Sequence, residues 1–395
     1  MSRGVRSVAV VGAGMAAARF ASRLLALAPP GGVEVTLYGA EPYGPYNRAL
    51  LVGALRGRPA PGELGLSAGR ATVRTGTEVV AVDAAARTLR TACGATAAYD
   101  VLVLATGSEP VLPELRGPVP RAGVHLLRTL ADRGRLAAGA RVARTVVVVG
   151  GGVLGVGVAR ALARPGVEVH LVCGASGLMA RHLDAGAAVA VRRTLTGAGV
   201  TVHAGPVVRL LGDERVVGAE LADGRCLDAR LAVLACGVRP RVAPARAAGL
   251  DVADGVVVDD GLATSAPGVY AIGDCAEHRG VVHGRAEAAW EQADVLAARL
   301  SGADPEAVCG ASPPYLRLNA GELEIAAFGD SAGEGTGVVV LADARGGTYR
   351  RLVWEGDVVV GAVLVGDLGM VGEVGDAVFG REVVEGDGVR LLLGG

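Results

Sequence analysis

The sequence predicts an α/β fold with two Rossmann-like, three-layer dinucleotide-binding domains, one inserted into the other, followed by a small C-terminal α+β domain. Two glycine-rich segments each follow a run of β-forming residues and precede a stretch rich in Ala, Leu and Arg. Two later strands end in similar small-residue turns. Because each feature occurs twice, the chain is expected to contain two domains of one kind.

The first glycine-rich segment has the spacing G-x-G-x-x-A. The β-forming residues 8–11 run directly into Gly12, Gly14 and Ala17. In such a segment the first glycine permits a tight turn, the second lets the backbone approach a pyrophosphate, and the third position must be small for the helix to pack on the strand. The positive end of the helix dipole then faces the phosphates. This segment predicts a dinucleotide site.

The second glycine-rich segment repeats the pattern with glycine at the third position. Thr145–Val149 lead into Gly150, Gly152 and Gly155. One match would be weak in a chain with 62 glycines, but two matches at strand-to-helix junctions are more specific. The chain is therefore expected to hold two nucleotide cofactors.

A second strand and an acidic residue follow the first predicted helix. After a helix over about 15–28 and a turn at 29–32, the strand Val33–Tyr38 leads to Glu41. An acid about 20 residues beyond the glycines commonly binds a ribose hydroxyl, and Glu41 is the candidate. The alternative is an ordinary glutamate on a surface loop.

Two buried strands end in small-residue turns followed by proline. Val101–Leu104 lead into 105–108, and Leu231–Leu234 lead into 235–240. Such turns suggest that the chain leaves one βαβ lobe there. The predicted domains are a dinucleotide domain over 1–117 and 241–311, an inserted one over 118–240, and a C-terminal domain over 312–395.

The rest of the chain is expected to return to the first dinucleotide domain and then to form the C-terminal α+β domain. A short strand ends on Gly273-Asp274, where a carboxylate can accept hydrogen bonds from sugar or ribityl hydroxyls. A helix from 286 to about 300 would point its first turn at the ligand ring. The C-terminal β runs are 323–328, 349–354 and Val358–Val365.

Composition argues against several other classes of protein. The net charge is -1 and no basic cluster occurs, so neither a nucleic-acid nor a membrane partner is expected. The apolar N-terminal stretch is interrupted by the fingerprint glycines, and no run is long enough to span a bilayer. We therefore expect a cytoplasmic protein.

Cysteine, histidine and carboxylate spacing gives no sign of a metal or acid–base site. The six cysteines contain no C-x-x-C pair, which argues against a redox dithiol, a zinc ribbon or an iron–sulfur ligand set. The histidines lack ligand spacing and are expected at the surface or supporting other groups. No catalytic carboxylate pair is expected among the acids near glycine-rich turns. The cysteines are Cys93, Cys173, Cys226, Cys236, Cys275 and Cys309; the histidines are His125, His170, His182, His203, His278 and His283; the acids are Asp251, Asp254, Asp259 and Asp260.

These linked motifs resemble the two-dinucleotide flavoprotein reductases, which include the pyridine-nucleotide:disulfide oxidoreductases and the ferredoxin or rubredoxin reductases. The resemblance covers essentially the whole chain and rests on residues 12–17, 105–107, 150–155, 237–240 and 273–274. Within that family, residues 41–51 are similar to the flavin-proximal loop in the FAD-binding reductase portion of assimilatory nitrite reductase large subunits. Residues 349–352 and 361–367 are similar to the same subunits.

The resemblance implies FAD at the first fingerprint and NAD(P)H at the second. Hydride would pass from NAD(P)H to the flavin, so no catalytic protein residue is required beyond the flavin, and no metal is implied. The implied FAD residues are Gly12, Gly14, Ala17, Glu41, Arg48, Ala105, Thr106, Gly107, Gly273, Asp274 and Trp290. The implied NAD(P)H residues are Gly150, Gly152, Gly155, Cys173, Arg181 and Gly237.

Three functions fit this resemblance. The main prediction is a reductase that passes electrons to a separate iron–sulfur or siroheme component of the nitrite or nitrate system. An alternative is a ferredoxin or rubredoxin reductase that serves an oxygenase. A third is a flavin-binding assembly or sensor subunit that does not turn over nicotinamide. Oligomeric state is left open.

The chain departs from its relatives at three places. Relatives commonly carry glutamate two residues past the last glycine of the second fingerprint, where this chain has Gly157. Those that prefer NADH carry an acid at the end of the next strand, where this chain has Cys173-Gly174, with Arg181 as the nearest partner for a 2′-phosphate. Residues 50–53 lack the serine or lysine often found beside the flavin. The choice between NADH and NADPH stays open.

Overall fold

The computed structural model describes residues 5–119, 122–310, 314–343, 346–380 and 391–392 of the 395-residue chain. The chain divides into two compact units. Unit 1 comprises Met1–Leu50, Pro59–Glu109 and Val238–Ser312, and unit 2 comprises Leu51–Arg58, Pro110–Gly237 and Pro313–Gly395. The boundary expected at 311/312 lies outside the described residues, and the three-domain division stays a prediction.

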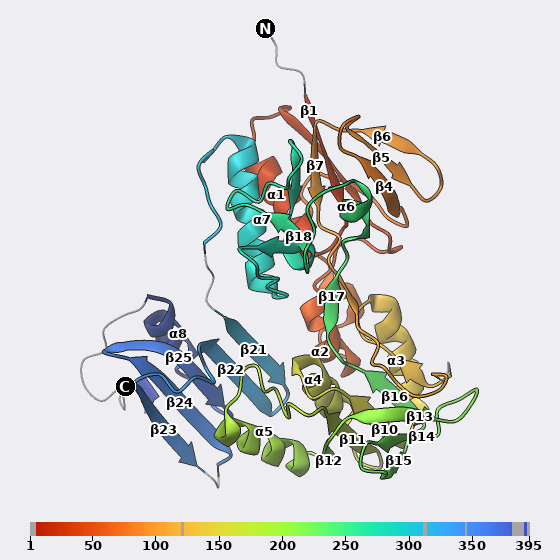
Figure 1. The fold of residues 1–395 in the computed structure, drawn as a ribbon, viewed down its shortest axis with the longest axis vertical. Helices are drawn as coiled ribbons and strands as arrows, with labels where there is room; N and C mark the ends of the chain where they lie inside the picture. The colour runs from red at the N-terminus through yellow and green to blue at the C-terminus, as the bar shows by residue number, and fades with distance from the viewer. Residues whose placement is uncertain (1–4, 120–121, 311–313, 344–345, 381–390, 393–395) are drawn as a thin grey trace. The chain divides into compact units, whose positions relative to one another are not determined.

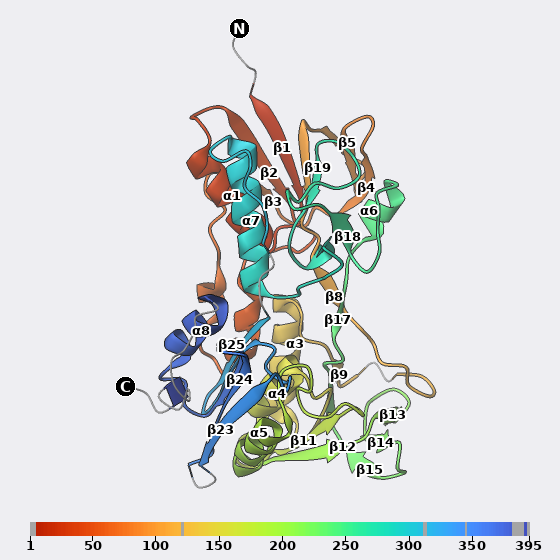
Figure 2. The same ribbon diagram turned by 60° about the vertical axis from the view of Figure 1, so that its left-hand side comes forward.

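Unit 1 is built around a five-stranded parallel sheet in the order β19-β7-β1-β2-β3. Helices α1 and α7 pack side by side, as Figures 1 and 2 show from two directions. A small antiparallel sheet, β4-β5-β6, follows β3 in the chain. The main elements are β1 (Arg6–Val11), α1 (Met15–Leu27), β2 (Val33–Tyr38), β3 (Thr72–Arg74), β4 (Val79–Asp83), β5 (Thr88–Thr91), β6 (Thr96–Ala98), β7 (Val101–Leu104), β19 (Val269–Ala271) and α7 (Ala286–Ser301).

Several shorter helices and strands belong to unit 1 or to the segments where the chain passes between the two units. β8 pairs with β17, and β18 pairs with β20 in parallel. They are the 3-10 helices η1 (Arg48–Leu50), η2 (Pro61–Leu64) and η3 (Gly273–Cys275), the strands β8 (Ser108–Pro110), β17 (Val238–Pro240), β18 (Val256–Val258) and β20 (Ala276–His278), and the helix α6 (Ala243–Ala247).

The strands of unit 1 have continuous apolar sequences because both of their faces lie in the core. Val10, Leu102 and Val103 are fully buried, since a parallel sheet is covered on both faces. Phe20 and Leu24 of α1 pack into the same core. Each buried side chain of this size contributes about 1.5–3 kcal/mol through removal of apolar surface from water.

Unit 2 contains a second parallel sheet in the order β12-β11-β10-β16-β9, accompanied by an antiparallel sheet β13-β14-β15. Four of these strands, β12-β11-β10-β16, repeat the order β3-β2-β1-β7 of unit 1. The fifth strand differs, since β9 precedes β10 in the chain whereas β19 follows β7. Helix α2 packs against α3 and α4. The elements are α2 (Leu51–Leu55), β9 (Val124–His125), α3 (Leu130–Val142), β10 (Thr145–Val149), α4 (Val153–Leu162), β11 (Glu168–Cys173), α5 (Ala185–Gly197), β12 (Val200–Ala204), β13 (Val207–Leu211), β14 (Gly218–Leu221), β15 (Cys226–Asp228) and β16 (Leu231–Leu234).

The C-terminal part of unit 2 is an antiparallel sheet in the order β21-β22-β25-β24-β23 with helix α8. Alternate residues of β24 serve different neighbours: Leu352 packs in a cluster with α8, whereas the hydroxyl of Tyr349 donates to Asp184 at the start of α5, 2.7 Å away. The elements are β21 (Tyr315–Ala320), β22 (Leu323–Gly329), β23 (Gly337–Asp343), β24 (Thr348–Glu355), β25 (Val358–Val365) and α8 (Val371–Gly380).

Within the described part of the chain, none of the helices is long and apolar enough to cross a membrane.

Candidate functional site

The first glycine of the first fingerprint is required by the fold itself. Gly12 follows β1 with φ +117°, a conformation that residues with a side chain rarely adopt. A Cβ on Gly12 would lie 2.1 Å from the carbonyl oxygen of Ala105. Gly12 therefore lets the turn after β1 pass directly over the turn after β7, and it holds Ala105 at the site.

The second glycine of this fingerprint faces open space. Gly14 caps the N-terminus of α1, and a Cβ there would meet no protein atom within 4 Å. Ala17, one turn into α1, is fully buried. The protein itself therefore leaves room at Gly14 for a group from outside the protein. The open N-terminus of α1 suits the pyrophosphate of a dinucleotide.

Glu41 and Arg48 come together near the end of β2. Arg48 donates through Nη2 to Glu41 Oε1, and the hydroxyl of Tyr46 donates to Glu41 Oε2 at 2.7 Å. The guanidinium carbon of Arg48 lies 4.9 Å from the centroid of the Tyr46 ring. The cluster is about three-quarters buried at Glu41 and Arg48. Tyr46 was not among the predicted site residues, although it stands in the same loop.

Side chains distant in the sequence fix the loop that contains Gly273 and Asp274. Ser108 Oγ donates to Asp274 Oδ2 at 2.8 Å, and the Gly273 N–H donates to Gln292 Oε1 at 2.7 Å. The hydroxyl of Thr106 donates to the carbonyl of Arg241 at 2.6 Å. The turn after β7, the turn after β19 and helix α7 are thereby tied together. Sequence reasoning missed the roles of Ser108 and Gln292 because their partners are far away in the chain.

Two other predicted residues of unit 1 lie in positions open to a ligand. Gly107 adopts φ +70° and a Cβ there would meet nothing within 4 Å, while its carbonyl accepts from the Arg241 N–H at 2.9 Å. Trp290, in the second turn of α7, is partly exposed rather than buried in the core. Both fit a bound ring or ribityl chain, and their contact with a flavin stays a prediction.

The second fingerprint repeats the backbone of the first. Gly150 has φ +118°, and a Cβ there would lie 2.2 Å from the carbonyl oxygen of Ala235. A Cβ at Gly155 would lie 1.8 Å from the carbonyl oxygen of Gly150, so α4 packs more closely on its strand than a methyl group would allow. Gly152 caps α4 and faces open space within 4 Å. The geometry thus fits a second dinucleotide at the start of α4.

The end of β11 carries a thiol where many relatives have an acid. Cys173 is 1% exposed, and its Sγ lies 2.5 Å from the position of a Cβ on Gly151. Burial raises the pKa of the Cys173 thiol, so it stays protonated and uncharged near neutral pH. The Met179 N–H donates to the Gly151 carbonyl at 2.9 Å, which folds the following turn back onto the phosphate loop.

The remaining predicted residues of unit 2 are less constrained. Arg181 is exposed in the turn after β11. Gly237 adopts φ +102° with no atom within 4 Å of a Cβ, and its carbonyl accepts from the Val111 N–H at 3.0 Å. A Cβ on Gly157 would lie 3.1 Å from Val52 of α2 and 3.5 Å from Leu318 of β21. The position where the resemblance led us to expect glutamate is thus a packing contact here.

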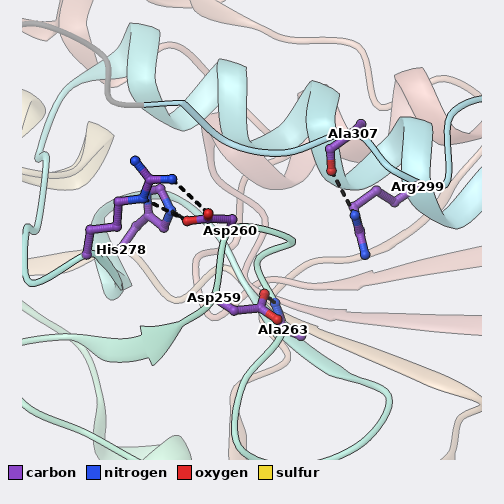
Figure 3. Close-up of polar contacts among 7 residues, drawn as sticks. Asp259, Asp260, Ala263, His278, Arg299 and Ala307 are labelled. Carbon is purple, nitrogen blue, oxygen red and sulfur yellow. Dashed lines mark hydrogen bonds and ion pairs between the residues drawn. The ribbon is translucent and has the colours of Figure 1, made fainter.

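Two of the carboxylates near the glycine-rich turns of unit 1, Asp259 and Asp260, fasten loops, as Figure 3 shows. Asp260 accepts from His278 Nε2 at 2.8 Å and from Arg279 through two hydrogen bonds of 2.8 and 2.7 Å. The pKa of Asp260 is held well below its ordinary value, first by Arg279 and then by His278. Asp259 accepts from the Ala263 N–H at 2.8 Å. These acids are used by the fold.

Three of the histidines, His170, His203 and His278, pair with one another or with acids. His278 is buried with Asp260, and His170 Nδ1 lies 3.0 Å from His203 Nε2, while Glu168 lies 3.1 Å from His170 Nε2. Among the residues described, no three His, Cys, Asp or Glu side chains are arranged to share a metal ion.

Comparison with known proteins agrees with this geometry. The family model for pyridine nucleotide-disulphide oxidoreductases matches residues 6–293. The chain is 33% identical over 372 residues to an NAD(P)H nitrite reductase of Bacillus subtilis (strain 168), an alignment that covers 92% of this chain and 46% of that protein. It is 31% identical over 341 residues to the assimilatory nitrate reductase electron transfer subunit of the same organism, covering 85% of this chain and 44% of that one.

A solved structure is similar over its full length. The covalent putidaredoxin reductase–putidaredoxin complex contains a chain with a TM-score of 0.89 and 26% identity, covering 99% of this chain and 98% of that chain. By contrast, the chain spans less than half the length of the two Bacillus relatives.

The chain belongs to the pyridine nucleotide-disulphide oxidoreductase family. The predicted family and the predicted α/β fold class, with two dinucleotide-binding folds, are therefore confirmed. The resemblance to the nitrite reductase large subunits is confirmed as well.

Proposed function

We propose that this chain is an FAD-dependent NAD(P)H oxidoreductase that delivers electrons to a separate redox protein of the nitrite or nitrate reductase system. One observation carries the proposal. In both fingerprints the first glycine is required by the protein's own backbone, whereas the second glycine, Gly14 or Gly152, faces space that no protein atom fills. A single chain thus offers two open helix N-termini, each suited to a dinucleotide pyrophosphate.

The residues of unit 1 would hold FAD. Gly14 and the first turn of α1 would receive the pyrophosphate, and Asp274, oriented by Ser108, would accept hydrogen bonds from ribityl hydroxyls. Glu41 would accept from a ribose hydroxyl while Tyr46 and Arg48 fix its orientation. When bound, FAD supplies hydride acceptance and one-electron release.

The residues of unit 2 would hold NAD(P)H. Gly152 and the first turn of α4 would receive its pyrophosphate. Cys173 at the end of β11 places an uncharged group where an acid would repel a 2′-phosphate. Both coenzymes therefore fit, and Arg181 would be the side chain that favours NADPH.

Anaerobic mixing tests the proposal. FAD-loaded protein is mixed with NADH and, separately, with NADPH while the flavin absorbance is recorded. We expect rapid bleaching with one coenzyme or both, because the hydride goes to the flavin. A spectrum that stays oxidised with both coenzymes would contradict the reductase function.

Electron delivery is tested with separate acceptors. The reduced protein is mixed with the iron–sulfur and siroheme component of a nitrite reductase and with a ferredoxin of an oxygenase system. The Bacillus relatives favour transfer to the first. Transfer to the ferredoxin alone would support the second candidate, a ferredoxin reductase, which the similarity to putidaredoxin reductase favours.

A third candidate is a flavin-binding subunit without nicotinamide turnover. The contact of Gly157 with Val52 and Leu318 favours it, because packing replaces a polar group that relatives carry at this position. The anaerobic experiment distinguishes the two functions: a flavin that binds but is not bleached supports this subunit.

A further inference from the structure

A pocket of about 310 Å³ lies in unit 2 at the C-terminal ends of three helices. Its walls come from the end of α2, from the first to the last turn of α3, and from the end of α4 with the residues after it. None of the fingerprint residues lines it. The proposed coenzyme site is at the N-terminus of α4, and a ten-residue helix separates its two ends by about 15 Å. The pocket is thus distinct from the dinucleotide site.

The charges that line this pocket are all positive. Arg56, Arg133, Arg141 and Arg164 are part of its wall, and the other lining residues are Ala, Leu and Gly. The whole chain, in contrast, has a net charge of -1. The pocket is therefore a local concentration of positive charge in a nearly neutral protein.

Helix capping accounts for two of these arginines. Arg133 donates through Nε and Nη2 to the carbonyl of Ala54 near the end of α2, at 3.2 and 2.6 Å. Arg164 donates through Nη2 to the carbonyl of Ala140 near the end of α3. Such bonds satisfy carbonyls that have no partner within their own helix.

Capping does not account for the other two. Arg56 and Arg141 are exposed, and their side chains make no hydrogen bond or ion pair with any residue that the structure describes. Three helix C-termini supply about -0.5 charge each, so they offset less than half of the four positive charges. The wall keeps a net positive charge of about 2.5 units, which a bound anion would neutralise.

A fifth guanidinium lies near that of Arg56 but does not line the pocket. Arg160 of α4 is 8% exposed, and its Nε has no hydrogen-bond partner among the described residues. Its Nη2 and the Nη1 of Arg56 lie 3.5 and 2.4 Å from the position of a Cβ on Gly321. The only acid paired with Arg160 in the described structure is Glu322, at 3.7 Å, and that side chain is 89% exposed. Exposed pairs of this kind are well screened by water.

We infer that this pocket binds a small anion with a diphosphate group. Guanidinium groups bind phosphate oxygens in pairs, and a diphosphate carries enough negative charge to match the unoccupied donors of Arg56 and Arg141. The volume of about 310 Å³ accommodates a diphosphate and lies at the lower end of the range of about 300–1,000 Å³ that is common for ligand pockets. The diphosphate can belong to free pyrophosphate or to a nucleoside diphosphate. This assignment does not depend on the proposed reductase function.

Isothermal titration calorimetry on the FAD-loaded chain tests the inference. Pyrophosphate, inorganic phosphate and a nucleoside diphosphate are titrated separately at constant ionic strength. We expect pyrophosphate to bind more tightly than phosphate. Binding that the double variant described below loses is assigned to the pocket. If that binding is tighter for the nucleoside diphosphate, a nucleotide is the source of the diphosphate, and if it is equal for both ligands, the source is free pyrophosphate. Absence of heat with all three ligands at about 1 mM would overturn the proposal.

A double variant locates the binding. Arg56→Gln with Arg141→Gln should raise the dissociation constant for pyrophosphate at least about tenfold, because two charge-assisted contacts are lost. The control pairs Arg90→Gln with Arg230→Gln, two exposed arginines outside the pocket, and should bind as the unmodified chain does. Equal binding by all three proteins would place the anion elsewhere and overturn the assignment. Flavin bleaching by NAD(P)H should be unchanged in the double variant, which separates this test from that of the reductase.

Discussion

The two phosphate loops have nearly the same backbone but different surroundings. Gly12 and Gly150 adopt φ +117° and +118°, and a Cβ on either would lie 2.1 or 2.2 Å from the carbonyl of the turn that crosses it. The strand after the first loop leads to Glu41, paired with Arg48, whereas the strand after the second ends at the neutral Cys173. The glycines thus determine the backbone conformation of each phosphate loop, while the residues at the end of the next strand distinguish the two sites.

The largest expected effect comes from the first glycine of each loop. Gly12→Ala and Gly150→Ala should each lower the free energy of unfolding by about 3 kcal/mol or more, because a methyl group overlaps a backbone carbonyl at an unfavourable φ. Denaturant unfolding measures the loss. Gly62→Ala, at a position with no atom within 4 Å of a Cβ, is the control. A large loss of unfolding free energy in only one of the two variants would show that the two loops are not structurally equivalent.

The two phosphate loops differ at the third position of the fingerprint, which is Ala17 in the first loop and Gly155 in the second. Gly155→Ala should cost about 2 kcal/mol, because its methyl group would collide with the Gly150 carbonyl. Ala17→Gly, in the other loop, should cost about 1–2 kcal/mol through helix propensity and the loss of a buried methyl group. Thermal unfolding of both variants checks this. A stabilising Gly155→Ala would contradict the tight packing of α4.

The histidines make stability depend on pH. Burial lowers the pKa of His203, with further lowering by His170 and Arg225 and opposition from Asp223. The native state therefore binds fewer protons than the unfolded state below about pH 6.5, and stability falls as the pH drops through this value. His203→Gln should reduce the slope of melting temperature against pH between about 7 and 5, where histidine titrates. An unchanged slope would show that His203 is not a source of the pH dependence. His125→Gln is measured for comparison, because burial also lowers the pKa of this histidine of unit 2.

The smallest expected effect is in unit 1. Arg19 of α1 makes two hydrogen bonds of 2.8 Å to Asp294 of α7, yet both side chains are at least one-third exposed. Arg19→Gln should therefore lower the free energy of unfolding by less than about 1 kcal/mol. Arg90→Gln, with an exposed arginine, is the control in the same denaturant titration. A loss above about 2 kcal/mol would show that the α1–α7 contact depends on this ion pair.

Local patterns predicted the backbone of both folds. The β-forming runs before Gly12 and Gly150 are strands, and helices begin where the spacing of the glycines indicates. These features depend on neighbouring residues and on one or two close approaches, so the sequence contains the information directly.

Side-chain partners could not be predicted in the same way. Ser108 and Asp274 are 166 residues apart, and Gly273 is fixed by Gln292 in a separate helix. The packing of Gly157 on Val52 depends on a helix that precedes it by about 100 residues. Such contacts arise from tertiary packing, which the periodicity of a single segment does not contain.

If each open loop holds one dinucleotide, the binding stoichiometry of two matched variants should show it. The unmodified chain should bind one FAD and one NAD(P)H. Gly14→Val should abolish FAD binding, and Gly152→Val should abolish NAD(P)H binding while FAD stays bound, because each side chain fills the space at one helix N-terminus. Retention of both ligands by both variants would contradict the claim.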